Sequence, residues 1–422
     1  MNNTEIERRT QRDFLGYILK VGRAHPRLLL ADLVLLAVAA ACYKWLFAGE
    51  WILIILIVLA ANGVWQTVSL VHDLWSYGRK RAGELSNNPL QTFELEPEVW
   101  EKYKMLSYSR LSCYAIYSPA LNSLLSTAGC TIETTFSHEK RVELERYIKS
   151  YADMLLPFLN LQRGALGKRG AAFFNEEKLC MASEIEQTAD GRWQVQLCDG
   201  NYYNSFLTNG IYDRCIPLKN NRTLTSPLYC ANYPIPLLDS SLLGNHIGVS
   251  TLAVSSNGYV LLMPQNSHSA MGSGLLAPSG SGSVDMKDYK PHLDLKSCIV
   301  KAVERELKEE SGLHPRHIER TVIVGFYRDV EQGGKPEFCC LSFLDCDHNE
   351  LASVVEHNSE NHGDGSYLLR FFEGGKVAQK EVDHFMEEHM QELSAKLLLN
   401  LSFAGDYYKT TFSTLREIKS EQ

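Results

Sequence analysis

The segment RELKEESGL, Arg305 to Leu313, gathers the residues of this sequence that are best suited to chemistry. Glu306, Glu309 and Glu310 are separated by steps of three and four, so a helix presents their carboxylates on one face. Like charges at this spacing repel and destabilise a helix on their own. A divalent cation reverses the sign of that energy, and Mg²⁺ prefers hard oxygen ligands together with substrate phosphate oxygens. The segment therefore predicts either a metal site or a solvated acidic face.

Two neighbours support the carboxylates. Arg305 precedes Glu309 by four positions, so an ion pair between them fixes the orientation of the carboxylate. Gly312 follows the last charged residue, where a left-handed cap costs little without a Cβ. We therefore expect the helix to end at this glycine.

The elements that must position this helix follow from periodicity. Residues 295–313 are amphipathic, with Ile299, Val300, Val303 and Leu307 on one stripe. Residues 247–264 predict two strands joined at Asn257-Gly258, a favoured hairpin turn. Segments 321–327 and 337–345 predict further strands, and residues 382–401 predict a second long helix. Cys339 and Cys340 fall within an apolar run and are expected to be buried small side chains.

The segment resembles the second half of the Nudix box, which reads Arg-Glu-apolar-x-Glu-Glu-x-Gly-apolar. The resemblance covers about residues 245–400 and implies a cytosolic Nudix-like α/β/α sandwich. It implies attack of water on a diphosphate linkage of a nucleoside diphosphate derivative, assisted by Mg²⁺ or Mn²⁺. Glu309 and Glu310 are then the principal metal ligands and catalytic residues. Glu306 is a further ligand or the base that takes the water proton, and Arg305 is structural support.

The first half of the box departs from the family pattern. Counting back from Arg305, Ser297 stands where the family has its glutamate. Pro278-Ser279-Gly280 is similar to the Pro-Gly-Gly that opens the family's loop, and Gly280 would let the backbone approach a phosphate. The missing carboxylate is then supplied by Asp285 or Asp288. This departure leaves open whether the domain is catalytically active.

Two apolar stretches near the N-terminus, residues 28–47 and 51–71, are long enough to cross a bilayer core. Basic residues precede the first stretch and follow the second, and the three-residue connection between them has none. We therefore predict a two-helix transmembrane hairpin in the inner (cell) membrane with both termini in the cytoplasm. Four polar or charged residues in the stretches either line a pore or cap helices and bond between the spans: Asp32, Lys44, Asn62 and Gln66.

The remaining organisation is less specific. The predicted segments are a basic N-terminus at 1–27, the hairpin at 28–82, an uncharacterised α+β middle region at 83–240 and the Nudix-like domain at 241–422. In the middle region, helix-like intervals run from Val99 to Tyr117 and from Glu139 to Leu161. Residues 193–207 predict a hairpin that turns at Asp199-Gly200. Whether the middle region is a separate domain or an extension of the last one stays open.

The composition limits the partners. The formal net charge is −8, which argues against binding a DNA or RNA duplex. Eleven cysteines without paired spacing indicate reduced thiols in a cytosolic compartment.

The order of hairpin, middle region and Nudix-like domain resembles effectors of bacterial cyclic-oligonucleotide antiphage systems (CBASS). That resemblance implies a homo-oligomer that binds a nucleotide signal, such as a cyclic oligonucleotide, and disrupts the lipid bilayer, hydrolyses nucleotides, or does both. The alternative is a membrane-tethered, Mg²⁺-dependent pyrophosphohydrolase. The sequence does not name the nucleotide or the oligomer number.

Overall fold

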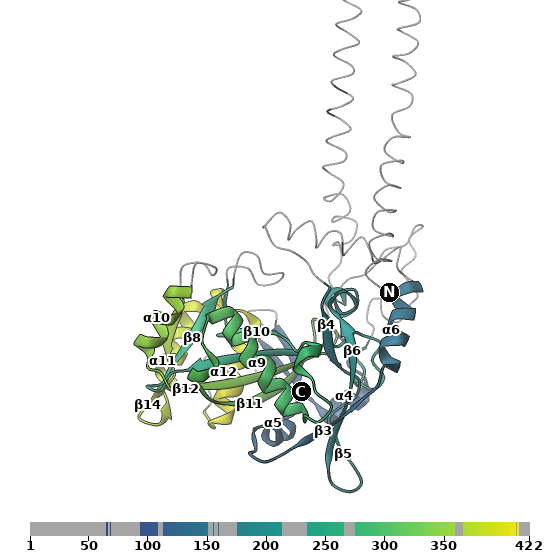
Figure 1. Cartoon of the computed structure of the whole chain (residues 1–422), viewed down its shortest axis with the longest axis horizontal. Helices are drawn as coiled ribbons and strands as arrows, with labels where there is room; N and C mark the ends of the chain where they lie inside the picture. The colour runs from purple at the N-terminus through teal and green to yellow at the C-terminus, as the bar shows by residue number, and fades with distance from the viewer. Residues whose placement is uncertain are drawn as a thin grey trace, which may run out of the picture. The chain divides into compact units, whose positions relative to one another are not determined.

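The computed structural model describes residues 93–108, 113–150, 175–212, 234–265, 275–358, 366–410 and positions 65, 68, 155, 159 and 412. The chain divides into two units, residues 1–87 with 151–164 and residues 88–150 with 165–422. The second unit, which contains all the labelled elements of Figure 1, is a mixed α/β fold.

No helix in these described ranges is long and apolar enough to cross a membrane. The longest of them, α9 (Leu295–Ser311), has 17 residues and is amphipathic, whereas a span requires about 20 apolar residues. This finding corrects the predicted fold class with its two-helix transmembrane hairpin, and it corrects the predicted location in the inner membrane. The stretches 28–47 and 51–71 lie outside the described residues except at positions 65 and 68, as do Asp32, Lys44, Asn62 and Gln66.

The main sheet has the strand order β1-β2-β11-β12-β7-β8-β13, with β10 paired to β7 and β9 paired to β8. Strands β7 and β12 are parallel, and the other pairs are antiparallel. The bounds are β1 Lys104–Tyr108, β2 Cys113–Tyr117, β7 Gly248–Val254, β8 Tyr259–Pro264, β9 Leu276–Ala277, β10 Gly280–Ser283, β11 Ile318–Asp329, β12 Lys335–Leu344 and β13 Tyr367–Arg370. The predicted hairpin at Asn257-Gly258 is confirmed as β7 and β8, and Gly258 has φ +90°.

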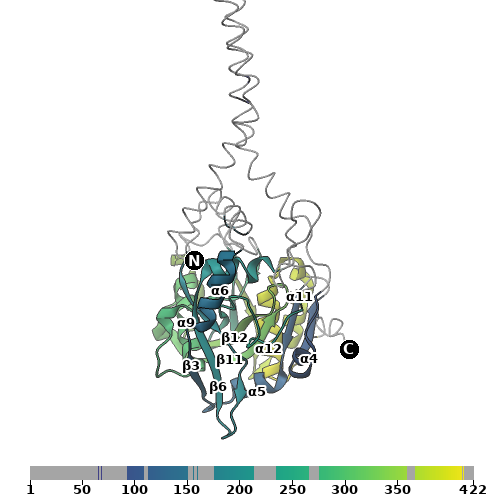
Figure 2. The same ribbon diagram turned by 90° about the vertical axis from the view of Figure 1, so that its right-hand side faces the viewer.

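Helices cover both faces of this sheet, because successive residues of a strand point to opposite sides. Leu252 of β7 packs in one core with residues of α11 (Gln379–His389) and α12 (Ala395–Tyr407). Ala253, the next residue, packs in a second core with Leu307 of α9 and Leu351 of α10 (His348–Asn358). Figure 2 shows α9 and α12 on opposite sides of β11 and β12. The described part of the predicted Nudix-like region is thus a sandwich of helix, sheet and helix.

Residues 88–150 and 165–240 of the middle region belong to the same unit as the predicted Nudix-like region. The first strands of the middle region, β1 and β2, join the main sheet at β11, so the helix expected from Val99 to Tyr117 is limited to α4 (Pro97–Lys102). A second sheet has the order β3-β6-β4, with β5 paired to β6. The remaining bounds are α5 Pro119–Ser126, β3 Ile132–Phe136, α6 Glu139–Ser150, β4 Glu177–Met181, β5 Glu186–Gln187, β6 Trp193–Asn201 and α8 Tyr202–Phe206.

The hairpin predicted at Asp199-Gly200 is wrong. Strand β6 continues through both residues and is followed by α8. A Cβ at Gly200 would lie 2.4 Å from Cys180 Sγ on the paired strand β4. The glycine is therefore explained by close packing between two strands and not by a turn.

Helix α9 begins and ends as its sequence predicts. The Asp294 side chain accepts a hydrogen bond from Ser297 N at 3.1 Å, and Gly312 closes the helix with φ 73°. Ile299, Val303 and Leu307 are fully buried. Strand β10 runs directly against this helix, because a Cβ at Gly280 would lie 2.6 Å from Leu307 Cα.

We expect Gly280→Ala to lower the free energy of unfolding by about 2 kcal/mol, because the new methyl group meets helix backbone that has no freedom to move aside. Urea denaturation followed by tryptophan fluorescence measures this difference. Ser281→Ala, one residue along the same strand, is the control and should change stability little. Equal stability of the two variants would contradict the proposed close packing.

Candidate carboxylate site on helix α9

Two of the three glutamates of α9, Glu306 and Glu310, contact strand β10. Glu310 Oε2 accepts a hydrogen bond from Ser281 N at 2.8 Å, and Glu306 Oε1 accepts one from Ser283 N at 3.3 Å. A Cβ at Gly282, between these two amides, would lie 2.2 Å from Glu306 Cδ. The side chain of Glu309 is 53% exposed and therefore open to solvent.

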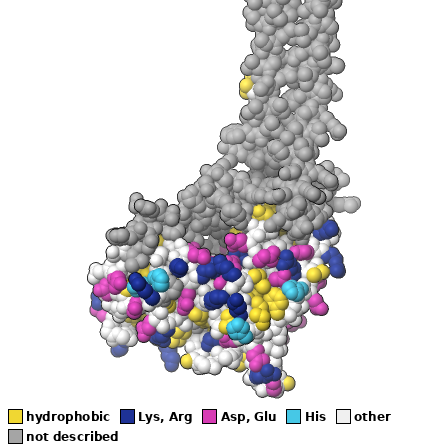
Figure 3. All heavy atoms as spheres, in the orientation of Figure 1, with side chains coloured by type: hydrophobic (Ala, Val, Ile, Leu, Met, Phe, Trp, Pro, Cys, Tyr) yellow, Lys and Arg dark blue, Asp and Glu magenta, His cyan; other side chains and the backbone are white. Residues whose placement is uncertain are grey.

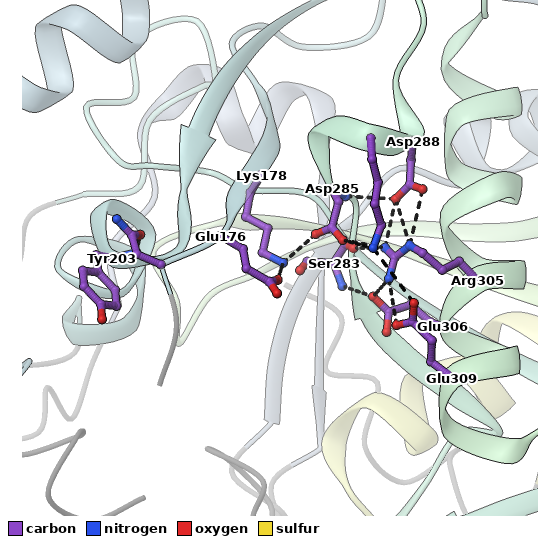
Figure 4. Close-up of polar contacts among 11 residues, drawn as sticks. Glu176, Lys178, Tyr203, Ser283, Asp285, Asp288, Arg305, Glu306 and Glu309 are labelled. Carbon is purple, nitrogen blue, oxygen red and sulfur yellow. Dashed lines mark hydrogen bonds and ion pairs between the residues drawn. The ribbon is translucent and has the colours of Figure 1, made fainter. Parts of the chain in front are cut away.

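Arg305 connects this cluster to the loop before the helix (Figure 4). Its NH1 group donates to Glu306 Oε1 at 2.8 Å and to Glu309 Oε2 at 3.2 Å. Its NH2 group donates to Asp288 Oδ2 and to the Ser283 carbonyl oxygen, both at 2.9 Å. The predicted ion pair with Glu309 is confirmed, and the guanidinium also fixes Glu306.

Asp288 and Asp285, the two candidates for the missing carboxylate, both lie beside Arg305. Asp288 is buried, accepts from Arg305 at two nitrogen atoms, and accepts from Asp285 N at 3.0 Å. Asp285 Oδ2 is 3.4 Å from Arg305 NH2 and 3.1 Å from Lys287 Nζ. Asp288 is therefore the carboxylate that orients the arginine, and Asp285 is a second contact shared with lysines.

A lysine from the middle region completes this network, and the sequence analysis missed it. Lys178 of β4 is buried, and its Nζ lies 2.6 Å from Asp285 Oδ1 and 2.7 Å from Glu176 Oε2 (Figure 4). Its strand is held against the loop by a hydrogen bond from Leu179 N to the Val284 carbonyl oxygen at 2.9 Å. The sequence offers only a weak signal for Lys178, which stands between two glutamates and the apolar residues Leu179 to Met181; a lysine is rarely buried without a partner.

Burial controls the protonation of the carboxylates. It raises the pKa of Glu310 to about 8, with smaller contributions from Glu306 and Glu309. Burial also raises the pKa of Glu306, against the opposing effect of Arg305. At Asp285 burial acts in the same direction, but the hydrogen bond and charge of Lys178, together with Arg305 and Lys287, outweigh it and lower the pKa. In Glu306 and Glu310, burial therefore disfavours the charged form, whereas the neighbouring Glu309 is exposed to solvent.

This donor set fits a hard divalent cation. Three carboxylates supply only oxygen ligands, which suits Mg²⁺ or Mn²⁺. A cation beside Glu306 and Glu310 would replace the protons that burial favours, because opposite charge stabilises the ionised carboxylates. Glu306, Glu309 and Glu310 are the residues that would hold it.

Three other residues have structural roles that the sequence did not predict. Gly280, expected to let the backbone approach a phosphate, makes room for α9. Arg328 is fully buried, 3.2 Å from Glu184 Oε1. Glu337 is fully buried between two lysines, Lys335 and Lys396.

Among the described residues, the side chains whose ligand atoms already lie within 4.8 Å of one another are those of His317, Asp345 and Cys346, and the three α9 glutamates do not approach one another this closely. Arg316 Nε donates to His317 Nε2 at 3.2 Å, and His317 Nδ1 lies 3.3 Å from Asp345 Oδ1. Both ring nitrogens thus have protein partners, and the mixed donor set does not suit Mg²⁺.

Charged side chains of both signs are interspersed on the face of the molecule in Figure 3.

No protein-family model and no curated protein matches this chain. The α9 carboxylates and their geometry are therefore the basis on which a function can be assigned.

We expect Glu310→Gln to stabilise the protein at about pH 8 more than at about pH 5. The folded-state pKa is about 8 and the ordinary value is 4.5, so the folded protein binds the proton more tightly than the unfolded chain. Wild-type stability should therefore fall as the pH rises from about 4.5 to about 8, by on the order of 3 kcal/mol from this residue.

Urea denaturation in EDTA at both pH values measures this difference. Glu319→Gln, at an exposed position of β11, is the control and should show no such pH dependence. A stability difference between Glu310→Gln and wild type that is equal at the two pH values would refute the elevated pKa.

Proposed function

We propose that this protein is a Mg²⁺- or Mn²⁺-dependent hydrolase that cleaves the diphosphate linkage of a nucleoside diphosphate derivative. The observation that carries the proposal is the set of three glutamates on one face of α9, held by Arg305 and by two backbone amides of β10. A structural role alone does not explain this set, because burying Glu306 and Glu310 beside each other opposes folding. Clusters of groups with perturbed pKa values favour a functional site.

The residues of the site have distinct tasks in this proposal. Glu309 is exposed and meets a cation from solvent first, while Glu310 is held by Ser281 N and has a proton to lose. A bound Mg²⁺ supplies neutralisation of phosphate charge and a lowered pKa for water. Glu306 either completes the ligand set or accepts the proton of the attacking water, for which its raised pKa is suited.

Arg305 acts through the glutamates. Its five donors are directed at Asp288, Glu306, Glu309 and the Ser283 carbonyl oxygen, so it orients carboxylates and is not available to a substrate. Asp288 in turn fixes the plane of the guanidinium. This arrangement keeps the carboxylates in position before any cation binds, which reduces the cost of reorganisation.

We expect purified protein to release product from a nucleoside diphosphate derivative when Mg²⁺ is present and to lose this turnover in EDTA. Glu309→Gln should lower kcat by about a hundredfold, because a metal ligand contributes several kcal/mol to the transition state. The measurement is a panel of dinucleotides, nucleoside diphosphate sugars and cyclic oligonucleotides, followed by separation of the products.

Glu319→Gln is the matched control and should keep full turnover. Binding of a cyclic oligonucleotide without cleavage of any linear diphosphate would favour a nucleotide-sensing effector instead. Turnover that is the same in Glu309→Gln and in wild type would reject the assignment of the carboxylates.

A further inference from the structure

A second group of charged residues lies beside the carboxylate site and is not used by the proposed mechanism. Glu337 of β12 is fully buried, and it pairs with Lys335 on its own strand and with Lys396 Nζ of α12 at 3.2 Å. The carboxylate lies over β7, where a Cβ at Gly248 would come within 2.0 Å of Glu337 Oε2. The Lys396 side chain is 29% exposed, whereas Lys335 and Glu337 are buried.

Two buried polar atoms in this neighbourhood have no hydrogen-bond partner among the described residues. They are Asn400 Oδ1 and His246 Nδ1, in side chains that are at least nine-tenths buried. The orientation of Asn400 is fixed, because its Nδ2 donates to the Lys396 carbonyl oxygen at 2.9 Å and to Ser250 Oγ at 2.7 Å. Burial of a polar atom without a partner opposes folding, so these two atoms favour a ligand that supplies hydrogen bonds.

Three lysines from different elements converge on His246. Burial lowers the pKa of His246, and the charges of Lys335, Lys178 and Lys396 lower it further. The Tyr202 ring, 6.0 Å from that of His246, is also within electrostatic range of Lys178 and Lys396. The basic residues around His246 therefore come from the middle region, which provides Lys178, and from β12 and α12, which provide Lys335 and Lys396.

The basic group adjoins the carboxylates of α9. Ser281, whose backbone amide donates to Glu310, is paired with Ser250 of β7, and Ser250 Oγ accepts a hydrogen bond from Asn400 Nδ2 of α12. Two lysine side chains here, Lys335 and Lys396, pair with a single carboxylate, Glu337. An anion would offset the surplus positive charge.

We propose that Lys396 and Lys335 form a phosphate-binding subsite, with Asn400 and His246 as hydrogen-bond positions for a hydroxyl group of the same ligand. The ligand class is a nucleotide phosphate, an assignment that rests on the proposed hydrolase function. The metal-bound phosphate would lie at Glu309 and Glu310, and a neighbouring phosphate of the same substrate would lie at Lys396. The subsite thereby selects substrates that have more than one phosphate group.

Phosphate binding in EDTA tests this subsite without the metal. We would titrate full-length protein with inorganic phosphate, AMP and adenosine by calorimetry. Phosphate and AMP should bind and adenosine should not. Lys396→Met should weaken phosphate binding by about tenfold, which corresponds to the loss of one charge-assisted hydrogen bond.

Three variants separate the subsite from a general loss of folding or charge. Lys396→Arg should retain binding, and Lys376→Met, at an exposed lysine of β15 (Lys376–Val377), should leave it unchanged. Glu337→Gln removes the competing carboxylate and should tighten phosphate binding several-fold, a gain that a purely structural role does not predict. Equal affinity of Lys396→Met and wild type, or weaker binding in Glu337→Gln, would overturn the proposal.

The two proposals fail separately. Glu309→Gln should bind phosphate in EDTA as wild type does and yet lack turnover. If the wild-type protein binds phosphate but shows no turnover, the phosphate subsite is supported and the hydrolase function is rejected. If the wild-type protein shows turnover but does not bind phosphate in EDTA, the hydrolase function is supported and the phosphate subsite is rejected.

Discussion

The Arg305 guanidinium is the interaction on which the site depends. It is mostly buried and donates to carboxylates on the helix and in the preceding loop, and to one backbone carbonyl oxygen. Burial opposes its charge, yet the hydrogen bond with Asp288 and the nearby carboxylates raise its pKa. Removing one partner from such a buried network costs several kcal/mol, because the remaining charges lose their compensation. The position of the three glutamates is therefore inseparable from this one cation.

The same constraint explains why the middle region belongs to the site. Asp285 contacts Arg305, but it also needs a partner of its own, and Lys178 supplies that charge from β4. Strand β4 is fixed by backbone hydrogen bonds to the segments that precede β7 and follow β10. A shift of the second sheet would thus be transmitted to the loop that carries Asp285 and Asp288. The middle region has a physical route to the carboxylates even though it provides none of them.

Local signals in the sequence predicted the local structure. The stripe of Ile299, Val303 and Leu307 and the glycine at 312 located α9, because periodicity and capping depend on neighbouring residues alone. Contacts between distant segments were beyond such signals. Gly200 was interpreted as a turn residue, but its reason is Cys180 on another strand. Lys178 belongs to no recognisable motif. The different roles of Asp285 and Asp288 became clear only from their contacts with Arg305.

Burial determines which of the carboxylates around α9 carry a charge readily and which favour a proton. Glu310 lies between Arg305-linked carboxylates on one side and Lys396 on the other, and its proton is the least costly way to keep it buried. A cation at Glu309 and an anion at Lys396 would each stabilise the ionised form of the groups they approach, and each would also attract the other. The proposed metal and phosphate subsites are therefore coupled through Glu310. A substrate that brings both charges at once satisfies the site better than either ion alone.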